Sequence, residues 1–331
     1  MKKIVVSLCT ALVIIVAAVI FKNSYSCNIP IGNRGINNAL SFAPLNALFV
    51  GSSSFRSNLD IDILDEKYED KAYILSYGGN QYAACDIQYD ELRDRFEHTR
   101  GSEALKISRD LGTLGTSDAL DNSDDVSYAE LVIFEMDPLM LTEKVKLSDS
   151  RVIWDLSRKG KRRLWNKMCK SEGTDTSFKV WYEYFVTSGM DDLVTYPVTE
   201  PFYSTRYRKG AKTGEVVSPG KEYLDNEKFD ISDSQIVQAQ ELAVLSIIEK
   251  CRRDNQEFIF LETPHYVRLA NDETYLKYKE YFLDFLSDVG ARCITCEDTG
   301  FDNTNPEYFE DMGHMTNLGR AEYTKLLVDI L

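Results

Sequence analysis

The stretch LNALFVGSSS, residues 45–54, is an apolar run that stops at a glycine and three serines. An apolar run of this length, bounded by glycine and small hydroxyl residues, is typical of a buried strand that turns sharply into a loop. A strand that is apolar along its length is covered on both faces, as in a parallel sheet. The stretch therefore predicts a strand over residues 45–50 and a tight turn from Gly51 to Ser54.

Four further short apolar runs repeat this pattern along the chain. Each run ends at a polar or glycine-containing turn, and stretches with helical spacing lie between the runs. Strands that alternate with helices predict a parallel sheet between two layers of helices. We therefore expect a flavodoxin-like three-layer α/β/α sandwich with a five-stranded parallel sheet. The other predicted strands are residues 72–75, 131–134, 258–261 and 291–295, and the predicted helices are residues 59–68, 81–98, 232–253, 272–289 and 317–331.

Residues 139–230 interrupt this alternation. The block has about 90 residues, which is too long for one crossover between neighbouring strands. It holds two stretches with helical spacing, residues 159–170 and 178–187, and an aromatic and basic loop over residues 201–223. We interpret the block as an insertion of helices and loops into one domain that spans residues 44–331.

The chain begins with two lysines and an apolar run from Ile4 to Phe21. The run is about 18 residues long, between the apolar core of a signal peptide and a membrane-spanning helix. Our first interpretation is an uncleaved signal anchor over residues 1–22. The alternatives are a signal peptide cleaved after Ser26 and a lipoprotein attached at Cys27. In each case we expect the domain outside the cytoplasm, beyond an Asn-, Gly- and Ser-rich linker at residues 23–43.

The formal net charge of -15 argues against nucleic acid as a partner, because nucleic-acid binding needs a basic surface. Seven cysteines would permit disulfides in an oxidising compartment, but the sequence does not show their pairing. Cys293 and Cys296 form a Cys-x-x-Cys pair, typical of redox or metal sites. The chain has no second pair at the spacing of a zinc site, which favours buried or locally bridged cysteines instead.

Residues able to perform acid/base chemistry follow the first and fifth predicted strands. Carboxyl ends of parallel strands meet at one edge of a sheet, where sites gather. A serine hydroxyl becomes a nucleophile when an imidazole accepts its proton and a carboxylate orients the imidazole. Ser53 follows the first strand, and Asp311 and His314 follow the fifth. The plainer alternatives are that Ser53 only ends a strand, that Asp311 caps a turn and that His314 is a surface residue.

The order of these motifs resembles the SGNH, or GDSL-type, hydrolases. Their first block is an apolar strand that ends in Gly-Asp-Ser, and here it reads Gly51-Ser52-Ser53. Their second block is a glycine after the second strand, matched by Gly79, with Gly78 as the alternative. Their last is Asp-x-x-His before a helix, matched by Asp311 and His314. The resemblance spans residues 45–331, although it covers the insertion poorly.

Two details resemble membrane-anchored bacterial members of that superfamily, distantly including the D-alanyl-lipoteichoic acid transfer proteins. One is the serine at position 52, and the other is Asn317-x-Gly319 after the histidine. The resemblance implies an extracytoplasmic serine-dependent esterase or O-acyltransferase that acts on acyl esters, most often acetyl, of cell-envelope or exopolysaccharide glycans. It implies no cofactor or metal. The expected partners are an acylated glycan or envelope polymer, the membrane, and a membrane acyltransferase.

In this resemblance Ser53 is the nucleophile, His314 the base and Asp311 the residue that orients it, with the oxyanion on the amides of Ser53 and Gly79. The chain departs from the family at the third block, Gly-x-Asn-Asp, whose Asn side chain also binds the oxyanion. Residues 135–138 read EMDP instead. Either Asn80 takes that role or the two backbone amides act alone. The departure keeps open a catalytically inactive SGNH-like protein that binds glycan or serves as a scaffold.

Three further residues are candidates for substrate binding. His265 follows the fourth predicted strand in the sequence Thr-Pro-His, where a role as a turn residue is an equal alternative. Arg206 and Tyr207 lie in the aromatic and basic loop of the insertion, which we expect to form a lid that binds sugars.

Overall fold

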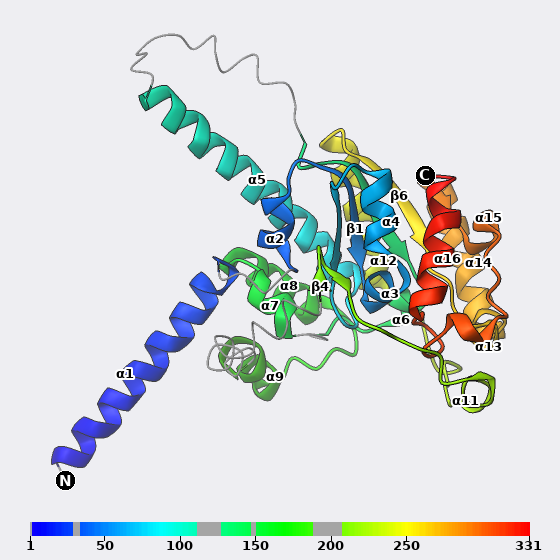
Figure 1. Ribbon diagram of the computed structural model, residues 1–331. Coiled ribbons are helices and arrows are strands. Elements are labelled where there is room, and N and C mark those ends of the chain that lie inside the picture. The colour runs from blue at the N-terminus through cyan, green and yellow to red at the C-terminus, as the bar shows by residue number, and fades with distance from the viewer. Residues whose placement is uncertain (1, 29–33, 111–126, 147–149, 188–206) are drawn as a thin grey trace.

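The computed structural model describes residues 2–28, 34–110, 127–146, 150–187 and 207–331. At its centre is a five-stranded sheet in the order β2-β1-β3-β6-β7 (Figure 1). Every neighbouring pair in this sheet is parallel, which confirms the predicted α/β sheet. Its strands are β1 (Leu45–Gly51), β2 (Ala72–Ser76), β3 (Ala129–Met136), β6 (Glu257–Glu262) and β7 (Cys293–Ile294).

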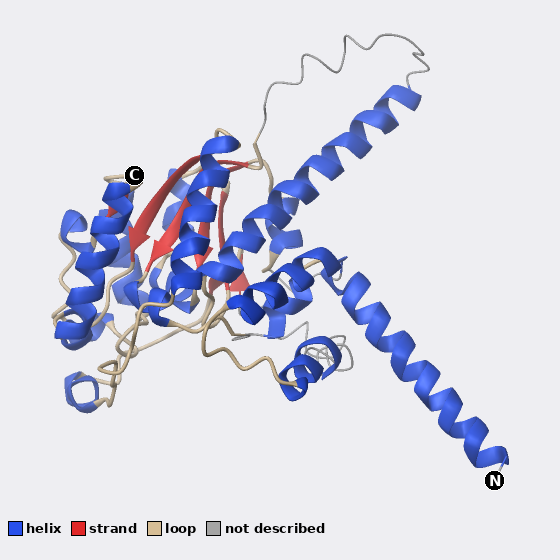
Figure 2. Cartoon of the chain, turned by 180° about the vertical axis from the view of Figure 1, so that it is seen from behind, coloured by secondary structure: helices blue, strands red, loops and turns tan. Residues whose placement is uncertain are grey.

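Helices cover both faces of the sheet, as Figure 2 shows. Successive side chains of a strand point to opposite faces. Leu48 and Val50 of β1 accordingly join one buried apolar cluster, whereas Ala47 and Phe49 join a second. The first cluster lies under α5 (Tyr82–Asp110), α12 (Gln238–Arg253) and α14 (Glu273–Asp288). The second lies under α3 (Ser53–Asn58), α4 (Ile61–Lys67) and α16 (Asn317–Val328), so the sandwich has the three expected layers.

Helix α12 begins at Gln238, six residues later than predicted from Ser232. The Val237 N–H donates to the carbonyl of Leu141 at 2.8 Å, and this bond holds the preceding chain against the start of the insertion. Short helices also follow the strand ends. They are α6 (Pro138–Thr142), α13 (Val267–Ala270), α15 (Cys296–Thr299) and the 3₁₀ turn η4 (Pro306–Tyr308).

The described parts of the insertion pack on the same domain. They are α7 (Ser150–Asp155), α8 (Arg158–Lys170), α9 (Phe178–Tyr182), a π-helical turn η3 (Glu183–Thr187), the hairpin β4 (Tyr207–Arg208) and β5 (Ala211–Lys212), and α11 (Lys221–Asn226). The hairpin covers the outer edge of β2, where the Ile74 N–H donates to the Lys209 carbonyl at 2.9 Å. Lys209 forms a buried ion pair with Asp65 of α4 at 2.7 Å, which fixes the hairpin to the domain.

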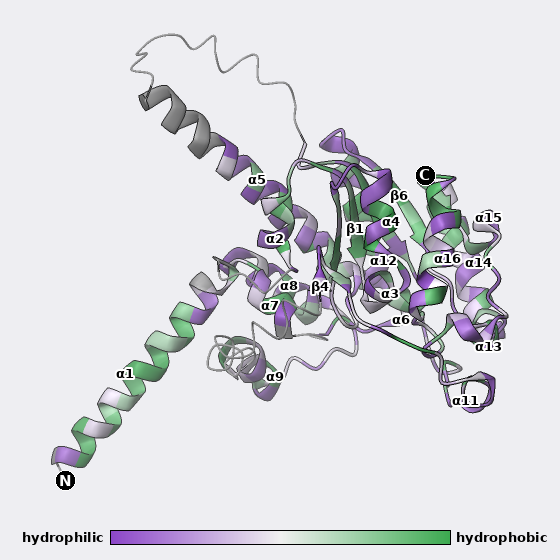
Figure 3. Ribbon diagram, in the orientation of Figure 1, coloured by the Kyte–Doolittle hydropathy of each residue, from purple (hydrophilic) through white to green (hydrophobic). Residues whose placement is uncertain are grey.

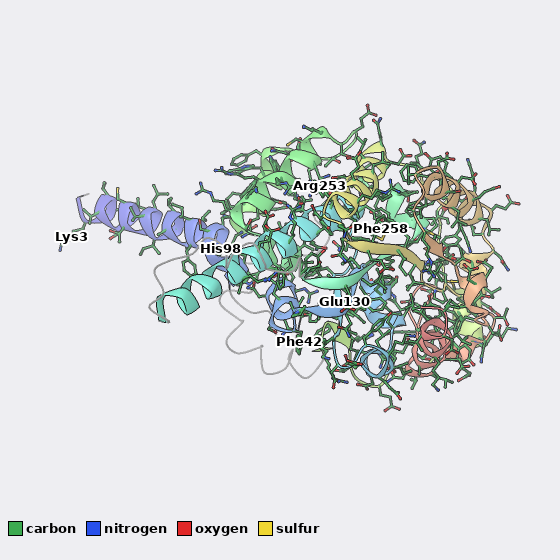
Figure 4. All side chains as sticks on the ribbon, turned by 90° about the horizontal axis from the view of Figure 1, so that it is seen from above. Lys3, Phe42, His98, Glu130, Arg253 and Phe258 are labelled. Atoms are coloured by element: carbon green, nitrogen blue, oxygen red, sulfur yellow. The ribbon has the colours of Figure 1, made fainter. Side chains whose placement is uncertain are left out.

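At the N-terminus, α1 (Lys2–Tyr25) is a helix long and apolar enough to span a membrane or to serve as a signal sequence. It projects from the domain and is apolar along most of its length (Figure 3). Figure 4, a view onto the amino-terminal ends of the strands, places Lys3 at its far end.

The described part of the predicted linker packs on the domain instead of forming a stalk. After η1 (Ser26–Asn28), α2 (Ile36–Ser41) packs on α5 and β2. Ile36 and Ala39 are fully buried, three residues apart on one face of α2. A linker prediction from Asn, Gly and Ser content missed this short apolar face because two residues make only a weak helical period.

Candidate functional site

Ser53 is the first residue of α3, directly after the turn that ends β1. Ser52 caps this helix, because its hydroxyl accepts from the Ser54 N–H at 3.2 Å. The Ser52 N–H in turn donates to the carboxylate of Glu135 on the neighbouring strand β3. A Cβ at position 51 would lie 2.5 Å from Oε2 of Glu135, so only glycine fits there. These contacts fix the turn and leave Ser53 partly exposed among buried neighbours.

Asp311 and His314 lie in the loop between η4 and α16. Asp311 Oδ1 accepts from the N–H groups of Gly313 at 2.8 Å and His314 at 2.9 Å. The Glu310 N–H donates to the His314 carbonyl at 2.8 Å, which closes the loop. Thr316 then caps α16 by accepting from the Gly319 N–H at 3.1 Å. The loop therefore folds the aspartate back onto the histidine three residues later.

The structure brings Ser53, His314 and Asp311 into one line of hydrogen bonds. His314 Nε2 lies 2.9 Å from Ser53 Oγ, and His314 Nδ1 lies 2.8 Å from Asp311 Oδ2. An ionised carboxylate only accepts, so Nδ1 carries the proton and donates to Asp311. Nε2 then presents its lone pair, and the Ser53 hydroxyl donates to it. This is the arrangement in which an imidazole removes the proton of an attacking serine.

Asp311 is kept ionised by its neighbours. Burial by itself raises the pKa of its carboxyl group, but hydrogen bonds from the His314 ring and from the N–H groups of Gly313 and His314 outweigh burial. The net result is a pKa below the ordinary value for aspartate. The carboxylate therefore remains a hydrogen-bond acceptor for His314 at neutral pH.

Asn58, at the end of α3, connects the helix that carries Ser53 to the loop that carries His314. Its side-chain Nδ2 donates to the carbonyls of Gly313 at 3.0 Å and Pro264 at 3.3 Å. Its Oδ1 accepts from the Met315 N–H at 2.9 Å. Asn58 thus binds the residue on each side of His314, and it is fully buried. No sequence motif pointed to it, because its partners lie more than 200 residues away.

The predicted oxyanion donors follow the ends of β1 and β2, which are neighbouring strands. Gly79 is exposed and has a φ of 59°, a left-handed conformation that favours glycine. The Ser53 N–H belongs to the first turn of α3, whose N–H groups have no partner within the helix itself. The side chain of Asn80 points inward: its Nδ2 donates to the Gly51 carbonyl at 3.0 Å and to Gln88 Oε1 at 3.1 Å. Asn80 braces the nucleophile turn through these bonds, and its role as an oxyanion donor stays a prediction.

A buried acidic cluster lies beneath the triad, at the ends of β3 and β6. Burial raises the pKa of Glu135 to about 7, with a further contribution from the charge of Asp137. His265 Nε2 lies 3.8 Å from Asp137 Oδ1, which is an ion-pair distance and too long for a hydrogen bond. Burial lowers the pKa of His265, but Asp137 and Glu262 raise it by more. His265 is 5% exposed, so substrate contact at this residue stays a prediction.

The insertion contributes one residue near the triad that the sequence did not indicate. Glu227 lies just after α11. Burial raises the pKa of Glu227, and the negative charge of Asp311 nearby raises it further. Tyr207 lies at the nucleophile helix, with the guanidinium groups of Arg34 and Arg56 at 4.4 and 5.5 Å from its ring. Arg206 lies outside the described residues. Glu227 was missed because a single acid in a loop carries no periodic or motif signal.

Cys293 and Cys296 carry free thiols at the end of β7. Burial raises the pKa of Cys293 to about 12 and that of Cys296 well above its ordinary value. A thiol that resists ionisation is a poor nucleophile and a poor redox group. Both residues are half-buried, and their environment favours structural cysteines over a redox pair.

Residues from the two ends of the domain's sequence thus meet at the carboxyl edge of the sheet. There a serine hydroxyl, an imidazole and a carboxylate follow one another along a line of hydrogen bonds. This set can transfer a proton away from Ser53 and return it to a leaving group. Neither a scan against models of known protein families nor a search of the curated proteins finds a match to this chain.

Proposed function

We propose that this protein is an extracytoplasmic serine-dependent esterase or O-acyltransferase. The observation that carries the proposal is the hydrogen-bonded line from Ser53 through His314 to Asp311. A serine that merely ended a strand would not need a buried residue, Asn58, to hold both neighbours of the histidine opposite it. The resemblance to the SGNH hydrolases supports the same chemistry.

The reaction follows from the positions of the protons. Ser53 Oγ attacks the carbonyl carbon of an acyl ester while its proton passes to His314 Nε2, and the N–H groups of Ser53 and Gly79 bind the oxyanion. The tetrahedral intermediate then collapses, and the alcohol leaves with the proton from His314. Water or a sugar hydroxyl next gives its proton to His314 and attacks the acyl-serine. This second attack releases a carboxylic acid or a new ester and restores Ser53.

The proposed substrates are acyl esters, mainly acetyl, of cell-envelope or exopolysaccharide glycans. The apolar length of α1 supports a location at the membrane. The C-terminal end of α1 also packs on the domain. Such packing favours an uncleaved anchor over a cleaved signal peptide. Catalysis by a serine triad needs no cofactor. A membrane acyltransferase that supplies the acyl group is the partner proposed for the transferase reaction.

An inactive glycan-binding or scaffold protein is the second candidate. Two observations favour it: Glu135 occupies the third-block strand end, and the amide of Asn80 is engaged in bonds to Gly51 and Gln88. With one oxyanion donor missing, the rate of an enzyme falls by about 10²–10³-fold. The two candidates therefore differ in turnover and not in fold.

Labelling with a fluorophosphonate tests the proposal on the full-length chain in detergent. We expect labelling of the wild type, loss of labelling in Ser53→Ala, and retention in Ser54→Ala, which removes the neighbouring hydroxyl. Release of acetate from an aryl acetate should likewise be seen with the wild type and Ser54→Ala and be lost in Ser53→Ala. Label that persists in Ser53→Ala would remove Ser53 from the role of nucleophile. A folded wild type with neither label nor turnover, but with saturable glycan binding, would favour the inactive candidate.

A further inference from the structure

Helix α9 presents an aromatic face that the described residues leave exposed. Phe178, Trp181 and Tyr182 have exposed fractions of 76%, 39% and 45%. Their spacing of three and four residues places them on one side of the helix. The ring of Phe178 stacks on that of Trp181 at 5.7 Å, so the three side chains form one continuous surface. We name these three residues the aromatic face.

The opposite side of the α9–η3 segment holds it on the domain. Val180 and Phe185 pack against the core, and the fully buried Tyr184 donates its hydroxyl to the Lys161 carbonyl of α8 at 2.8 Å. Because these contacts fix the orientation of the segment, the aromatic face on its other side is held outward. A soluble surface rarely gathers large aromatic side chains in this way unless they meet a partner or a membrane.

The end of the apolar helix α1 lies directly against this segment. Asn23 Nδ2 donates to the Phe185 carbonyl at 2.7 Å, and Lys22 Nζ donates to the Val186 carbonyl at 3.2 Å. Figures 1 and 2 both draw α9 beside the C-terminal half of α1, on the side of the domain from which α1 departs. A membrane crossed by α1 would thus place its interface next to α9.

The charges around this position suit a lipid surface. Arg158, Lys159 and Arg162 are exposed at the start of α8, within one turn of Lys161, and Lys161 binds the last carbonyls of α1. Basic side chains attract anionic headgroups, and Trp and Tyr rings prefer the boundary between headgroups and acyl chains. A helix with an aromatic face and nearby cations is the usual form of a segment that lies in the membrane interface.

We propose that the α9–η3 segment is a second membrane contact, in which the aromatic face inserts into the lipid interface beside α1. The proposal rests on the anchoring role of α1 in the proposed function. One helix alone leaves a domain free to rotate about its axis, whereas two contacts fix which side faces the bilayer. In Figure 1 the strands run toward the lower side of the domain, where α9 also lies, and α3, which begins with Ser53, follows the end of β1. The second contact would hold the triad over substrates at the membrane surface.

Quenching of Trp181 by lipids tests the proposal. The full-length chain is reconstituted in vesicles of phosphatidylcholine and phosphatidylglycerol that carry a nitroxide either near the headgroup or at the end of an acyl chain. The emission of Trp181 is the difference between the wild type and Trp181→Phe. We expect loss of most of this emission with the shallow nitroxide and little loss with the deep one. The matched control is the emission of Trp154, which is the difference between the wild type and Trp154→Phe. Trp154 is buried in the domain, so neither nitroxide should quench it.

A second variant and a separate assay distinguish the outcomes. Phe178→Ser combined with Tyr182→Ser should reduce the quenching of Trp181 while the chain stays in the vesicles after alkaline washing. An integrated wild type whose Trp181 is not quenched overturns the second contact. A chain that alkaline washing removes overturns the anchor and the second contact together. A wild type that fluorophosphonate does not label, but whose Trp181 is quenched, would refute the proposed enzyme activity alone and leave the membrane contact supported.

Discussion

Asn58 sets the distance between His314 and Ser53, because it belongs to the helix of the serine and binds both neighbours of the histidine. The variant Asn58→Asp keeps the shape and the acceptor for the Met315 N–H. It places a carboxylate oxygen against the carbonyls of Gly313 and Pro264, where an amide now donates. We expect a loss of about 1–3 kcal/mol in the free energy of unfolding. In steady-state kinetics with an acetyl ester, kcat should fall roughly 10–100-fold at unchanged KM.

The matched control is Asn46→Asp. Asn46 Nδ2 also donates to a carbonyl, that of Tyr68 at 3.3 Å, but it lies at the opposite end of β1. We expect this variant to keep the wild-type kcat. Equal kcat values for the two variants, measured at the same folded fraction, would show that Asn58 does not position His314.

Glu135 makes a second prediction at the residue scale, concerning pH. Its pKa is raised from 4.5 to about 7, so the folded state holds its proton more tightly than the unfolded state does. Wild-type stability should therefore fall as pH rises from about 4.5 to 7, relative to Glu135→Gln, by about 3 kcal/mol in total. Gln can keep both contacts, accepting from the Ser52 N–H and donating to the Thr263 hydroxyl. Urea unfolding of both proteins across this pH range measures the difference.

Glu130→Gln is the control for that experiment. Glu130 lies at the start of the same strand, β3, and is exposed. Its substitution should leave the pH dependence of stability unchanged. If Glu135→Gln and the wild type show parallel stability from pH 4.5 to 7, then the buried carboxyl group is not the source of the effect.

At the scale of elements, the β4–β5 hairpin depends on Gly210. Lys209 and Gly210 form its two-residue turn, with φ values of 47° and 83°, as in a type I′ turn. A Cβ at position 210 would lie 1.7 Å from the carbonyl oxygen of Ile74. We expect Gly210→Ala to lower the free energy of unfolding by more than about 3 kcal/mol, because a buried clash adds to backbone strain. Chemical denaturation measures this loss.

Gly220→Ala separates the two causes. Gly220 has a φ of 93°, and no atom lies within 4 Å of the Cβ position. This variant should lose only the cost of the left-handed backbone, about 1–2 kcal/mol. A similar loss in both variants would mean that the hairpin moves away from β2 without a penalty.

The sequence predicted the elements with a strong apolar signal and missed those that depend on tertiary contacts. The five strands were found because each is a buried run that ends at a polar turn, although β7 is only two residues long. The sequence did not predict the β4–β5 hairpin, because its turn has lysine before glycine, where Asn or Asp is usual. Lys209 holds that conformation through its ion pair with Asp65, a contact that no local pattern reveals.

The same limit applies to the candidate site. Ser53, Asp311 and His314 each follow a predicted strand, so the geometry of a parallel sheet was enough to place them at one edge. Asn58 and Glu227 act through distant partners and carry no motif. The sequence did not predict the bonds from the Asn80 amide to Gly51 and Gln88, and the role of Asn80 as an oxyanion donor stays a prediction.

At the scale of the whole molecule, the apolar helix α1 and the domain form a continuous structure. Lys161 of α8 is fully buried, and its ammonium group donates to the carbonyls of Lys22 at 3.2 Å and Asn23 at 3.4 Å and to the Ser26 hydroxyl at 2.6 Å. These carbonyls belong to the last turn of α1, whose acceptors have no partner within the helix. Burial lowers the pKa of Lys161 to about 8, so the group is still mostly charged at pH 7.

Lys161→Met should therefore loosen the connection between α1 and the domain. Methionine keeps much of the length of the side chain but leaves the carbonyls of α1 without a donor, at a cost of about 1–3 kcal/mol. In vesicles at pH 7, trypsin should then release the domain by cutting after Lys22 or after Arg34 at least roughly fivefold faster than in the wild type. Lys159→Met removes an exposed lysine from the same helix and should leave the rate unchanged. Equal release from Lys161→Met and the wild type would mean that the ammonium group does not hold α1, and that the domain is oriented by other contacts.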